Sequence, residues 1–244
     1  MSLHELTRHR LAAGSLLETL RANAPPGIRI RSDAELAATL AAALVGHDPT
    51  EDLHVFGYGS LMWNPAMDVA HTCAAHVRGW HRRYCLRMIF GRGTPQSPGA
   101  MLALDRGGAC RGLLFRIDAA KVPTELHLLW QREMLAGSYD ARWVRVRAGG
   151  QLLRALTFVV NRTHDRYIAC QPLETVAHLI RTGHGPLGSS RAYFESTLQA
   201  LESLGIRDAG IERLRRAIVR ADREEDDARM LPASGSISTS GQAL

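Results

Sequence analysis

Between residues 53 and 160 the chain alternates strand-like runs with glycine- and proline-rich turns, which limits the folds open to it. The strand-like runs are LHVFGYG, TCAAHVRGWHRRYCLRM, GAMLALD, CRGLLFRI, ARWVRVRA and LRALTFVV, and turns such as GRGTPQSPG and DRGGAC separate them. Helical patterns follow at PTELHLLWQREML, LETVAHLIRTG, SSRAYFESTLQALESLG and GIERLRRAIVRAD. Several strands, one helix among them and helices at the end predict an α+β domain built on a curved sheet or small barrel.

The regions on either side of residues 53–217 differ from this body. Residues 1–50 are predicted to form an N-terminal helical extension, in which SDAELAATLAAALVG opens with a capping box of Ser32 and Glu35. The stretch REEDDARMLPASGSISTSGQAL becomes acidic and then rich in serine and glycine. Such a composition buries little apolar surface, so we expect residues 222–244 to form a disordered tail.

The composition excludes several classes of protein. The chain has 244 residues, of which 45% are hydrophobic and 22% charged, and this balance indicates a globular protein. The sequence contains no run of about 18 apolar residues, so it predicts no membrane-spanning helix. Its first residues also lack the apolar region of a secretory signal. The cysteines are widely spaced without a CxxC motif, which favours free thiols and a cytoplasmic location. They are Cys73, Cys85, Cys110 and Cys170.

The charge pattern gives little support for nucleic-acid or metal binding. The net charge is +6, but the arginines are spread along the chain and Lys121 is the only lysine, so we expect no nucleic-acid partner. His71, His76 and His81 follow one another in five-residue steps. That step matches neither one face of a helix nor one face of a strand, so we expect no metal site. The sequence gives no indication of the oligomeric state.

One carboxylate falls on the apolar face of the helix that begins near Pro123. The apolar stripe of this helix is Leu126, Leu129 and Trp130. Glu133 follows these residues at spacings of seven, four and three, and therefore lies on the same stripe. An ionised carboxylate that faces a core is costly unless it is paired or has a function. An ion pair, for instance with Arg132, would explain the position structurally, and a catalytic role would explain it functionally.

The segment Gly57-Tyr58-Gly59-Ser60 places two glycines around an aromatic residue where a core strand should pack side chains. Glycines at a strand end allow backbone N–H groups to approach a ligand closely, because no Cβ intervenes. Successive amides with a serine hydroxyl would form an anion-binding concavity, and Tyr58 would supply a flat wall with a polar tip. The structural alternative is a strand-to-turn junction with glycine at a bulge. The segment matches neither phosphate-loop nor dinucleotide-binding spacing.

Longer blocks of the sequence carry a resemblance to a known family. These blocks are VFGYGSLMWNP, GWHRRYCL, GRGTPQSPGAMLALDRGGACRGLLFRI, WQREMLAGSYDARWV and ALTFVVNRTHDRYI. Together they resemble the ChaC family, the γ-glutamylcyclotransferases specific for glutathione, which are sometimes labelled cation transport regulators. The resemblance covers roughly residues 53–217, and it implies a γ-glutamylcyclotransferase-like small β-barrel with flanking helices.

The resemblance also implies site residues. In the family a glycine-rich segment holds the γ-glutamyl group, and here it corresponds to Gly57, Tyr58, Gly59, Ser60, Leu61 and Met62. The catalytic glutamate of the family corresponds to Glu133, so two independent arguments converge on this residue. The chain departs from the family at Gly137-Ser138, where two glycines are usual, and at GSSRAYFEST, where relatives often carry asparagine.

The implied reaction cleaves glutathione to 5-oxoproline and Cys-Gly, and it requires neither a metal nor an organic cofactor. Arg92 and Thr94 are candidates to close over the glycine carboxylate of the substrate, although a solvated loop explains them equally well. Tyr139 and Tyr193 are candidates to line the pocket, unless they are core tyrosines, and Arg83 is a candidate partner of Glu133 or of the substrate. The alternatives are cleavage of other γ-glutamyl amines or dipeptides, and a non-catalytic regulator.

Overall fold

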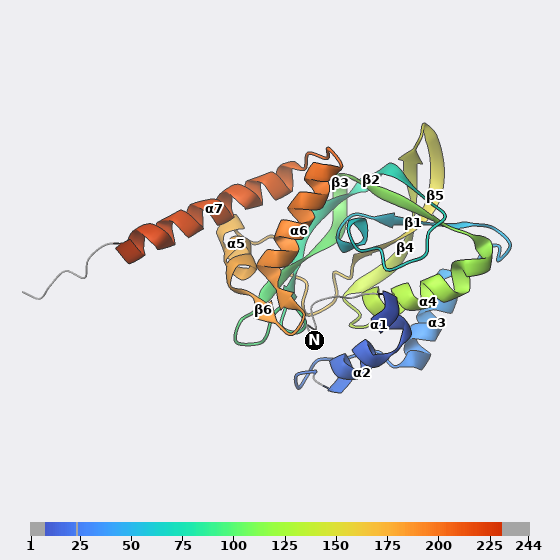
Figure 1. Ribbon diagram of the computed structural model, residues 1–244, viewed down its shortest axis with the longest axis horizontal. Helices are drawn as coiled ribbons and strands as arrows, with labels where there is room; N and C mark the ends of the chain where they lie inside the picture. Colours follow the sequence, from blue (N-terminus) through green and yellow to red (C-terminus); the bar gives the residue numbers. More distant parts are fainter. Residues whose placement is uncertain (1–7, 23, 231–244) are drawn as a thin grey trace, which may run out of the picture.

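The computed structural model describes residues 8–22 and 24–230, and among these residues five strands close into a barrel (Figure 1). The strands are β1 (Leu53–Gly57), β2 (His71–Met88), β3 (Gly99–Ile117), β4 (Tyr139–Ala148) and β5 (Gln151–Val160). Neighbours are hydrogen-bonded in the order β1-β3-β2-β4-β5, and β5 returns to pair with β1 through Val55 and Leu156. The α+β class and the small barrel predicted from the sequence are confirmed.

β3 corrects one expectation, because the stretch DRGGAC is not a turn between two strands. β3 runs unbroken through it, antiparallel to β2. Gly107 and Gly108 adopt φ angles of 99° and 66°, and the pairing register shifts opposite them, between Arg78 and Trp80, where Gly79 has a φ of 80°. The glycines therefore absorb a bulge and a bend in a long hairpin, which a local sequence signal cannot distinguish from a turn.

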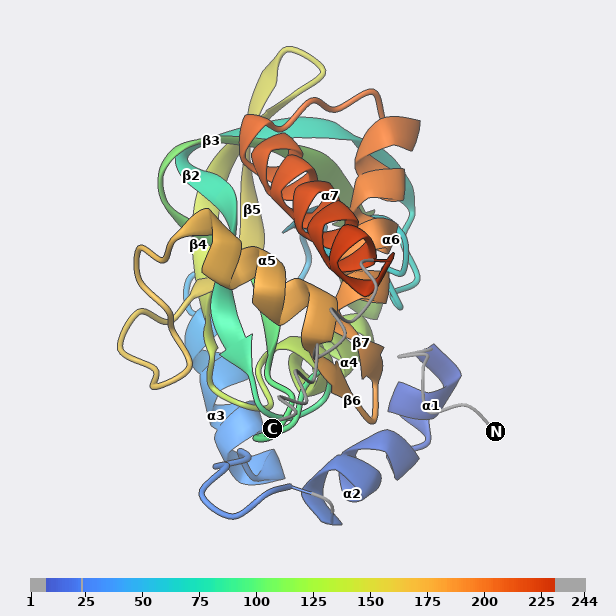
Figure 2. The ribbon, with the colours of Figure 1, turned by 90° about the vertical axis from the view of Figure 1, so that its left-hand side faces the viewer.

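The helices cover the barrel in two groups, which Figures 1 and 2 show on different sides of it. The first group is α1 (Arg8–Ala12), α2 (Ser15–Ala22), α3 (Asp33–Ala43) and α4 (Val122–Glu133), and the second is α5 (Leu173–Thr182), α6 (Ser190–Ser203) and α7 (Ala209–Met230). A two-stranded pair, β6 (His184–Gly185) and β7 (Gly188–Ser189), lies between α5 and α6 in the chain. Each group buries its apolar side chains in a separate core against the barrel.

The N-terminal helices are tied to α4, which carries Glu133. The capping box is confirmed: the Ser32 hydroxyl accepts the Glu35 N–H at 3.2 Å, and the Glu35 carboxylate accepts the Ser32 N–H at 2.9 Å. The α3 helix that begins there contacts α4, where the indole N–H of Trp130 donates to the Thr39 hydroxyl at 3.1 Å. The N-terminal extension therefore packs directly behind the helix that positions the candidate site.

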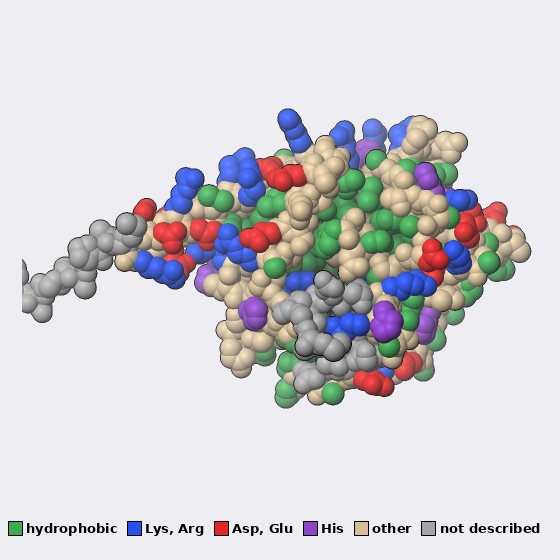
Figure 3. All heavy atoms as spheres, in the orientation of Figure 1, with side chains coloured by type: hydrophobic (Ala, Val, Ile, Leu, Met, Phe, Trp, Pro, Cys, Tyr) green, Lys and Arg blue, Asp and Glu red, His purple; other side chains and the backbone are tan. Residues whose placement is uncertain are grey.

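The C-terminal expectation is wrong for residues 222–230. They continue α7, whose end extends beyond the body of the molecule (Figure 1). Acidic and basic side chains intermingle along this part of α7 (Figure 3), and pairs such as Arg229 with Glu225, at 2.6 Å, follow helical spacing. These intrahelical pairs explain why a charged stretch forms a helix. Residues 231–244 lie outside the described part of the chain.

Candidate active site

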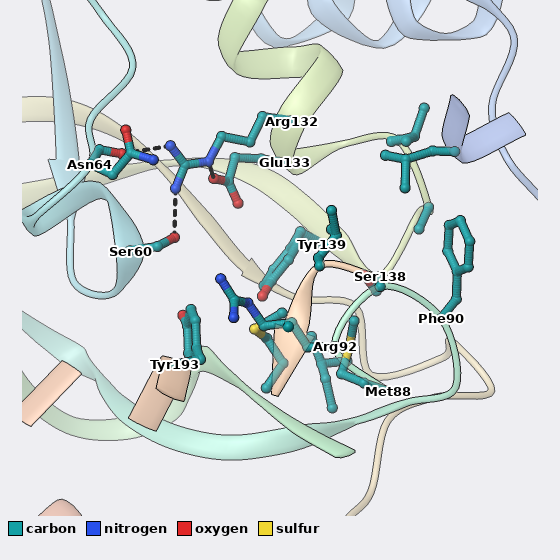
Figure 4. Close-up of a pocket in the computed structure, with 18 of the residues that line it drawn as sticks. Ser60, Asn64, Met88, Phe90, Arg92, Arg132, Glu133, Ser138, Tyr139 and Tyr193 are labelled. Atoms are coloured by element: carbon teal, nitrogen blue, oxygen red, sulfur yellow. Dashed lines mark hydrogen bonds and ion pairs between the residues drawn. The ribbon is translucent and has the colours of Figure 1, made fainter. Parts of the chain in front are cut away.

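A cavity of about 670 Å³ opens between the end of α4, the adjoining parts of β2 and β3, and the start of α6. This volume lies in the usual range for small-molecule sites. Figure 4 shows Ser60, Arg132 and Glu133 on one side of the cavity, with Arg92 and Tyr193 across from them. The predicted site residues that line the cavity are Ser60, Arg92, Glu133, Tyr139 and Tyr193. The segment after β1 and the helix α4, far apart in the sequence, thus meet at one site.

Glu133 is the last residue of α4 and lies on the stripe that the sequence predicts. Leu126, Leu129 and Trp130 are buried at 0%, 1% and 1% exposure, and they anchor the same face of the helix. The Glu133 side chain is 14% exposed and lines the cavity. Burial raises the pKa of Glu133, because it disfavours the charged carboxylate, and the neighbouring Arg132 opposes this rise. The carboxylate is therefore a group that can exchange a proton within the cavity.

Arg132 forms the ion pair that the sequence offered as a structural explanation of Glu133. Its Nε lies 3.0 Å from the Glu133 carboxylate, and its side chain is only 2% exposed. The remaining guanidinium nitrogens donate to the Ser60 hydroxyl at 2.7 Å and to the Asn64 carbonyl at 2.6 Å. The ion pair and a functional Glu133 are thus compatible, since the same guanidinium links the carboxylate to the glycine-containing segment.

Most side chains of that segment pack in the protein core, which corrects the expectation that Tyr58 forms a wall of the site. The Tyr58 hydroxyl donates to the Phe158 carbonyl at 2.7 Å, and its ring is buried, so Tyr58 does not supply a wall of the cavity. A Cβ on Gly57 would lie 2.7 Å from the ring of Phe115, so this glycine is required by packing. Leu61 and Met62 likewise pack against the cores.

Gly59 and Ser60 are the part of the segment nearest to the cavity. A Cβ on Gly59 would lie 3.2 Å from the Tyr193 hydroxyl, and Tyr193 lines the cavity. Ser60 opens a short 3₁₀ turn, Ser60–Met62, in which the Met62 N–H donates to the Gly59 carbonyl at 2.8 Å. The first N–H groups of such a turn find no acceptor inside it. That these amides face a substrate stays a prediction.

Tyr139, Tyr193 and Arg92 line the cavity and make further contacts with the protein. The Arg92 guanidinium stacks 5.3 Å from the ring centre of Tyr193 and donates to the Ser189 carbonyl at 3.3 Å. Burial, together with the nearby charge of Glu133, raises the pKa of Tyr193 to about 12, so its hydroxyl stays protonated. Tyr139 donates its hydroxyl to the Leu102 carbonyl at 2.8 Å. Ser138, one of the departures from the family pattern, is buried and lines the cavity.

Several lining residues are not predicted from the sequence. Arg166 and the apolar Leu20, Met88 and Phe90 line the cavity. Arg166 lies in the family-like block ALTFVVNRTHDRYI, which is the one sequence signal that points to it, and the three apolar residues have no such signal. Arg83 does not approach Glu133 as one alternative proposed, because it pairs with Asp105 at 2.9 Å. Leu20 belongs to the N-terminal extension, so the extension contributes directly to the cavity wall.

The described part of the chain gives no geometric support for a metal or a disulfide. Among the described residues no group of three or more His, Cys, Asp or Glu side chains could hold a metal ion. Cys73, Cys85, Cys110 and Cys170 are all free thiols. Within residues 8–22 and 24–230, no helix combines the length and apolar character needed to cross a lipid bilayer.

Comparisons with known proteins agree with this architecture. A relative from Escherichia coli (strain K12), named glutathione-specific gamma-glutamylcyclotransferase, is 40% identical over 73% of this chain and 78% of its own length. A Homo sapiens relative, named glutathione-specific gamma-glutamylcyclotransferase 1, is 32% identical over 60% of this chain and 68% of its own length. The crystal structure of the yeast gamma-glutamylcyclotransferase specific to glutathione has the same fold, with a TM-score of 0.65, 19% identity, and coverage of 69% of this chain and 96% of that chain. The family described as ChaC-like protein matches residues 53–221, and the chain belongs to this family.

Proposed function

We propose that this protein is a glutathione-specific γ-glutamylcyclotransferase, which cleaves glutathione to 5-oxoproline and Cys-Gly. The observation that carries the proposal is the Glu133 carboxylate, which lines a substrate-sized cavity and is linked through Arg132 to the Ser60 turn. The names of the relatives from Escherichia coli and Homo sapiens support the choice of glutathione as the substrate.

The reaction is intramolecular, so much of the catalysis is positioning. The α-amine of the γ-glutamyl unit attacks the γ-carbonyl carbon, a five-membered ring closes, and the bond to the cysteine nitrogen breaks. Well-oriented intramolecular reactions reach effective molarities of about 10⁵ M or more. A cavity that folds the γ-glutamyl unit back on itself would therefore supply a large part of the rate enhancement.

Glu133 is proposed as the general base and then the general acid. The α-amine is mostly protonated at neutral pH and cannot attack in that state, so a carboxylate beside it takes a proton. Glu133 releases this first proton to solvent, takes the second proton from the ring nitrogen once the new C–N bond has formed, and passes it to the leaving nitrogen of Cys-Gly, so that the products are the neutral lactam and the free amine. Such proton transfer typically contributes ~10²–10⁴-fold. The raised pKa of Glu133 brings the proton affinity of its carboxylate closer to that of the α-amine, from which it takes the proton.

The developing oxyanion requires hydrogen-bond donors, and the turn that begins at Ser60 is the candidate source. The amides of Gly59, Ser60 and Leu61 lie at the start of this turn, and one well-placed donor contributes about 3 kcal/mol. Arg92, Tyr139 and Tyr193 are proposed to hold the substrate from the other walls of the cavity. For Gly57 and for the side chains of Tyr58, Leu61 and Met62 we propose an indirect role, in which their packing fixes the turn.

We further propose that the protein acts in the cytoplasm without a metal or organic cofactor, and that residues 53–217 form the catalytic unit. The free cysteines support a reducing compartment. The mechanism above needs only a carboxyl group and backbone donors.

The experiment that tests the proposed function offers the purified protein glutathione, γ-Glu-Ala and a simple γ-glutamyl amine, and measures the release of 5-oxoproline. We expect release from glutathione at a much higher kcat/KM than from the other two compounds. A preference for γ-Glu-Ala or the amine would indicate a cyclotransferase with another leaving group. Binding of glutathione without any 5-oxoproline would indicate a non-catalytic member of the family.

A further inference from the structure

Arg166 is a buried cation in the wall of the cavity, and no carboxylate pairs with it among the described residues. The residue is 5% exposed, and its guanidinium makes one long hydrogen bond, 3.4 Å, to the Ala136 carbonyl. Asp165, its neighbour in the chain, is exposed and has its carboxylate 2.7 Å from His164. Taking a charge out of water costs several kcal/mol unless a partner compensates for it. An arginine in this position therefore indicates an anion that the cavity receives.

The loop that carries Arg166 is held rigidly by a second buried group. Asp105 is fully buried, and its carboxylate accepts from Arg83 at 2.9 Å, from Arg162 at 2.6 Å and from the Tyr167 hydroxyl at 3.0 Å. Arg162 and Tyr167 lie on either side of Arg166 in the chain. The loop is thus fixed to the barrel at both ends, and Arg166 is presented to the cavity by a preorganised support.

The same loop is also fixed to the turn that follows α4. The Asn161 amide donates to the Gly137 carbonyl at 3.1 Å, and the His164 ring lies 3.0 Å from the Ala136 carbonyl. The backbone of Arg166 is bound to β2 as well, because its carbonyl accepts the Arg87 N–H at 2.8 Å. The position of Arg166 relative to Glu133 is therefore set by the short segment between Glu133 and Gly137.

The charges of the cavity match those of glutathione. Arg132 is compensated by Glu133, whereas Arg92 and Arg166 have no carboxylate within ion-pair distance among the described residues. Glutathione carries one ammonium group and two carboxylates. In the proposed reaction the ammonium group lies at Glu133, which leaves two carboxylates for two arginines.

We propose that Arg166 binds the glycine carboxylate of glutathione and so determines the specificity of the site for the tripeptide. This inference rests on the proposed function. The α-carboxylate is bonded to the carbon that bears the reacting amine, so it lies close to Glu133. Arg92, whose guanidinium is directed into the cavity near Ser60 and Tyr193 in Figure 4, suits that carboxylate. The glycine carboxylate lies at the opposite end of the substrate, and Arg166 makes neither a hydrogen bond nor an ion pair with Glu133 or Arg132.

This assignment changes the role that the sequence suggests for Arg92. The sequence makes Arg92 the candidate for the glycine carboxylate because it lies in a polar loop that could close over the substrate. The structure directs it toward the catalytic groups, where it stacks on Tyr193. Among the described residues of the cavity wall, Arg166 is the other arginine without a carboxylate partner.

The experiment compares glutathione with its glycine amide, a near-isosteric analogue that lacks only the terminal negative charge. We expect the wild-type protein to prefer glutathione by ~10–100-fold in kcat/KM, as a lost charge-assisted hydrogen bond implies. Arg166→Met is expected to lower kcat/KM for glutathione by a similar factor, mainly through KM, and to leave the amide unaffected. Arg166→Lys keeps the charge and is expected to retain part of the preference.

A buried arginine that does not line the cavity provides the matched control. Arg82 is 4% exposed and pairs with Asp208 at 2.6 Å, and it does not line the cavity. Arg82→Met is expected to lower the thermal stability and to leave the preference for glutathione over the amide unchanged.

The outcomes separate this proposal from the proposed function. Equal losses for glutathione and the amide in Arg166→Met, or no loss for either, would overturn the role of Arg166 while the cyclotransferase activity stands. If Arg166→Met does not fold, equal wild-type kcat/KM values for glutathione and the amide would overturn it in the same way. A wild-type protein that releases no 5-oxoproline from glutathione would instead overturn the proposed function and this inference with it.

Discussion

The guanidinium of Arg132 donates to the hydroxyl of Ser60 at 2.7 Å, across 72 positions of the chain. Through its Nε the same group pairs with the Glu133 carboxylate at 3.0 Å. The proposed base and the turn proposed to bind the oxyanion are therefore positioned relative to each other by one buried side chain. Arg132 is therefore a positioning residue: it acts on the reaction through its contacts with Glu133 and Ser60.

Arg132→Met is expected to reduce kcat by about 10²-fold or more, because it frees both Glu133 and the Ser60 turn from their common support. Ser60→Ala, which removes only one of the three contacts, is expected to cause a smaller loss. Steady-state rates of 5-oxoproline release from glutathione, with thermal unfolding as a check on folding, measure both effects. A larger loss in Ser60→Ala than in Arg132→Met would contradict the positioning role.

The pH dependence of the reaction follows from the burial of Glu133. Burial raises the pKa of this carboxyl group, and the base must be ionised, so kcat/KM should increase as the pH rises through that raised pKa. Arg132 lowers the pKa of Glu133, and its replacement by Met should therefore move the acidic limb to higher pH. A pH profile of kcat/KM for both proteins provides the measurement. An unchanged or downward-shifted limb in the variant would argue against Glu133 as the titrating base.

Tyr58 and Tyr193 are expected to respond differently to removal of the hydroxyl group. Tyr58→Phe leaves the buried carbonyl of Phe158 without its donor, so it should cost about 1–3 kcal/mol of stability with little effect on KM. Tyr193→Phe should instead affect turnover, because Tyr193 lines the cavity next to Gly59. Denaturant unfolding and steady-state kinetics on both variants separate the two roles. A large KM effect in Tyr58→Phe would restore the sequence interpretation of this residue as a cavity wall.

Arg31 is expected to stabilise the end of α4. Its guanidinium donates to the Met134 carbonyl at 2.9 Å, and its backbone N–H donates to the Leu135 carbonyl at 2.9 Å. A cation at a helix C-terminus satisfies carbonyls that have no partner in the helix. Arg31→Met should therefore lower the stability by about 1 kcal/mol and reduce kcat, since Glu133 immediately precedes this position.

Arg29→Met provides the control for Arg31, because Arg29 is 82% exposed and its ion pair, with Glu35, lies at the surface. Surface pairs contribute little, so this variant should match the wild-type protein in stability and turnover. Equal effects of the two substitutions would show that the contacts of Arg31 with the end of α4 have no special importance.

Much of the fold follows from local patterns in the sequence. The features that are predicted wrongly depend on interactions that a local pattern does not show. The Ser32–Glu35 capping box and the stripe that carries Glu133 depend on spacing within one or two helical turns, and both are predicted correctly. The continuity of β3 through Gly107 depends on pairing with β2, so a local signal reads it as a turn. The helical state of residues 222–230 depends on ion pairs that composition alone does not reveal.

The residues of the candidate site also fall into those that local sequence patterns predict and those that depend on the tertiary structure. Glu133 is found from helical periodicity together with the family resemblance, and Ser60 from the glycine-rich segment. The direction of the Tyr58 side chain is set by the barrel interior, where Phe158 offers a carbonyl, and no residue near Tyr58 in the sequence signals this. Arg166 lies in the block ALTFVVNRTHDRYI that carries the family resemblance, but no local pattern in the block shows that it is buried, because its burial results from a loop that Asp105 fixes to the barrel.

The most direct test of the account is the turnover of Glu133→Gln with glutathione. The amide has almost the same shape as the carboxylate but cannot accept the amine proton, so we expect this variant to bind glutathione and to release 5-oxoproline at least ~10²-fold more slowly than the wild-type protein. Wild-type turnover by a folded Glu133→Gln protein would contradict the central claim that this carboxylate moves the proton.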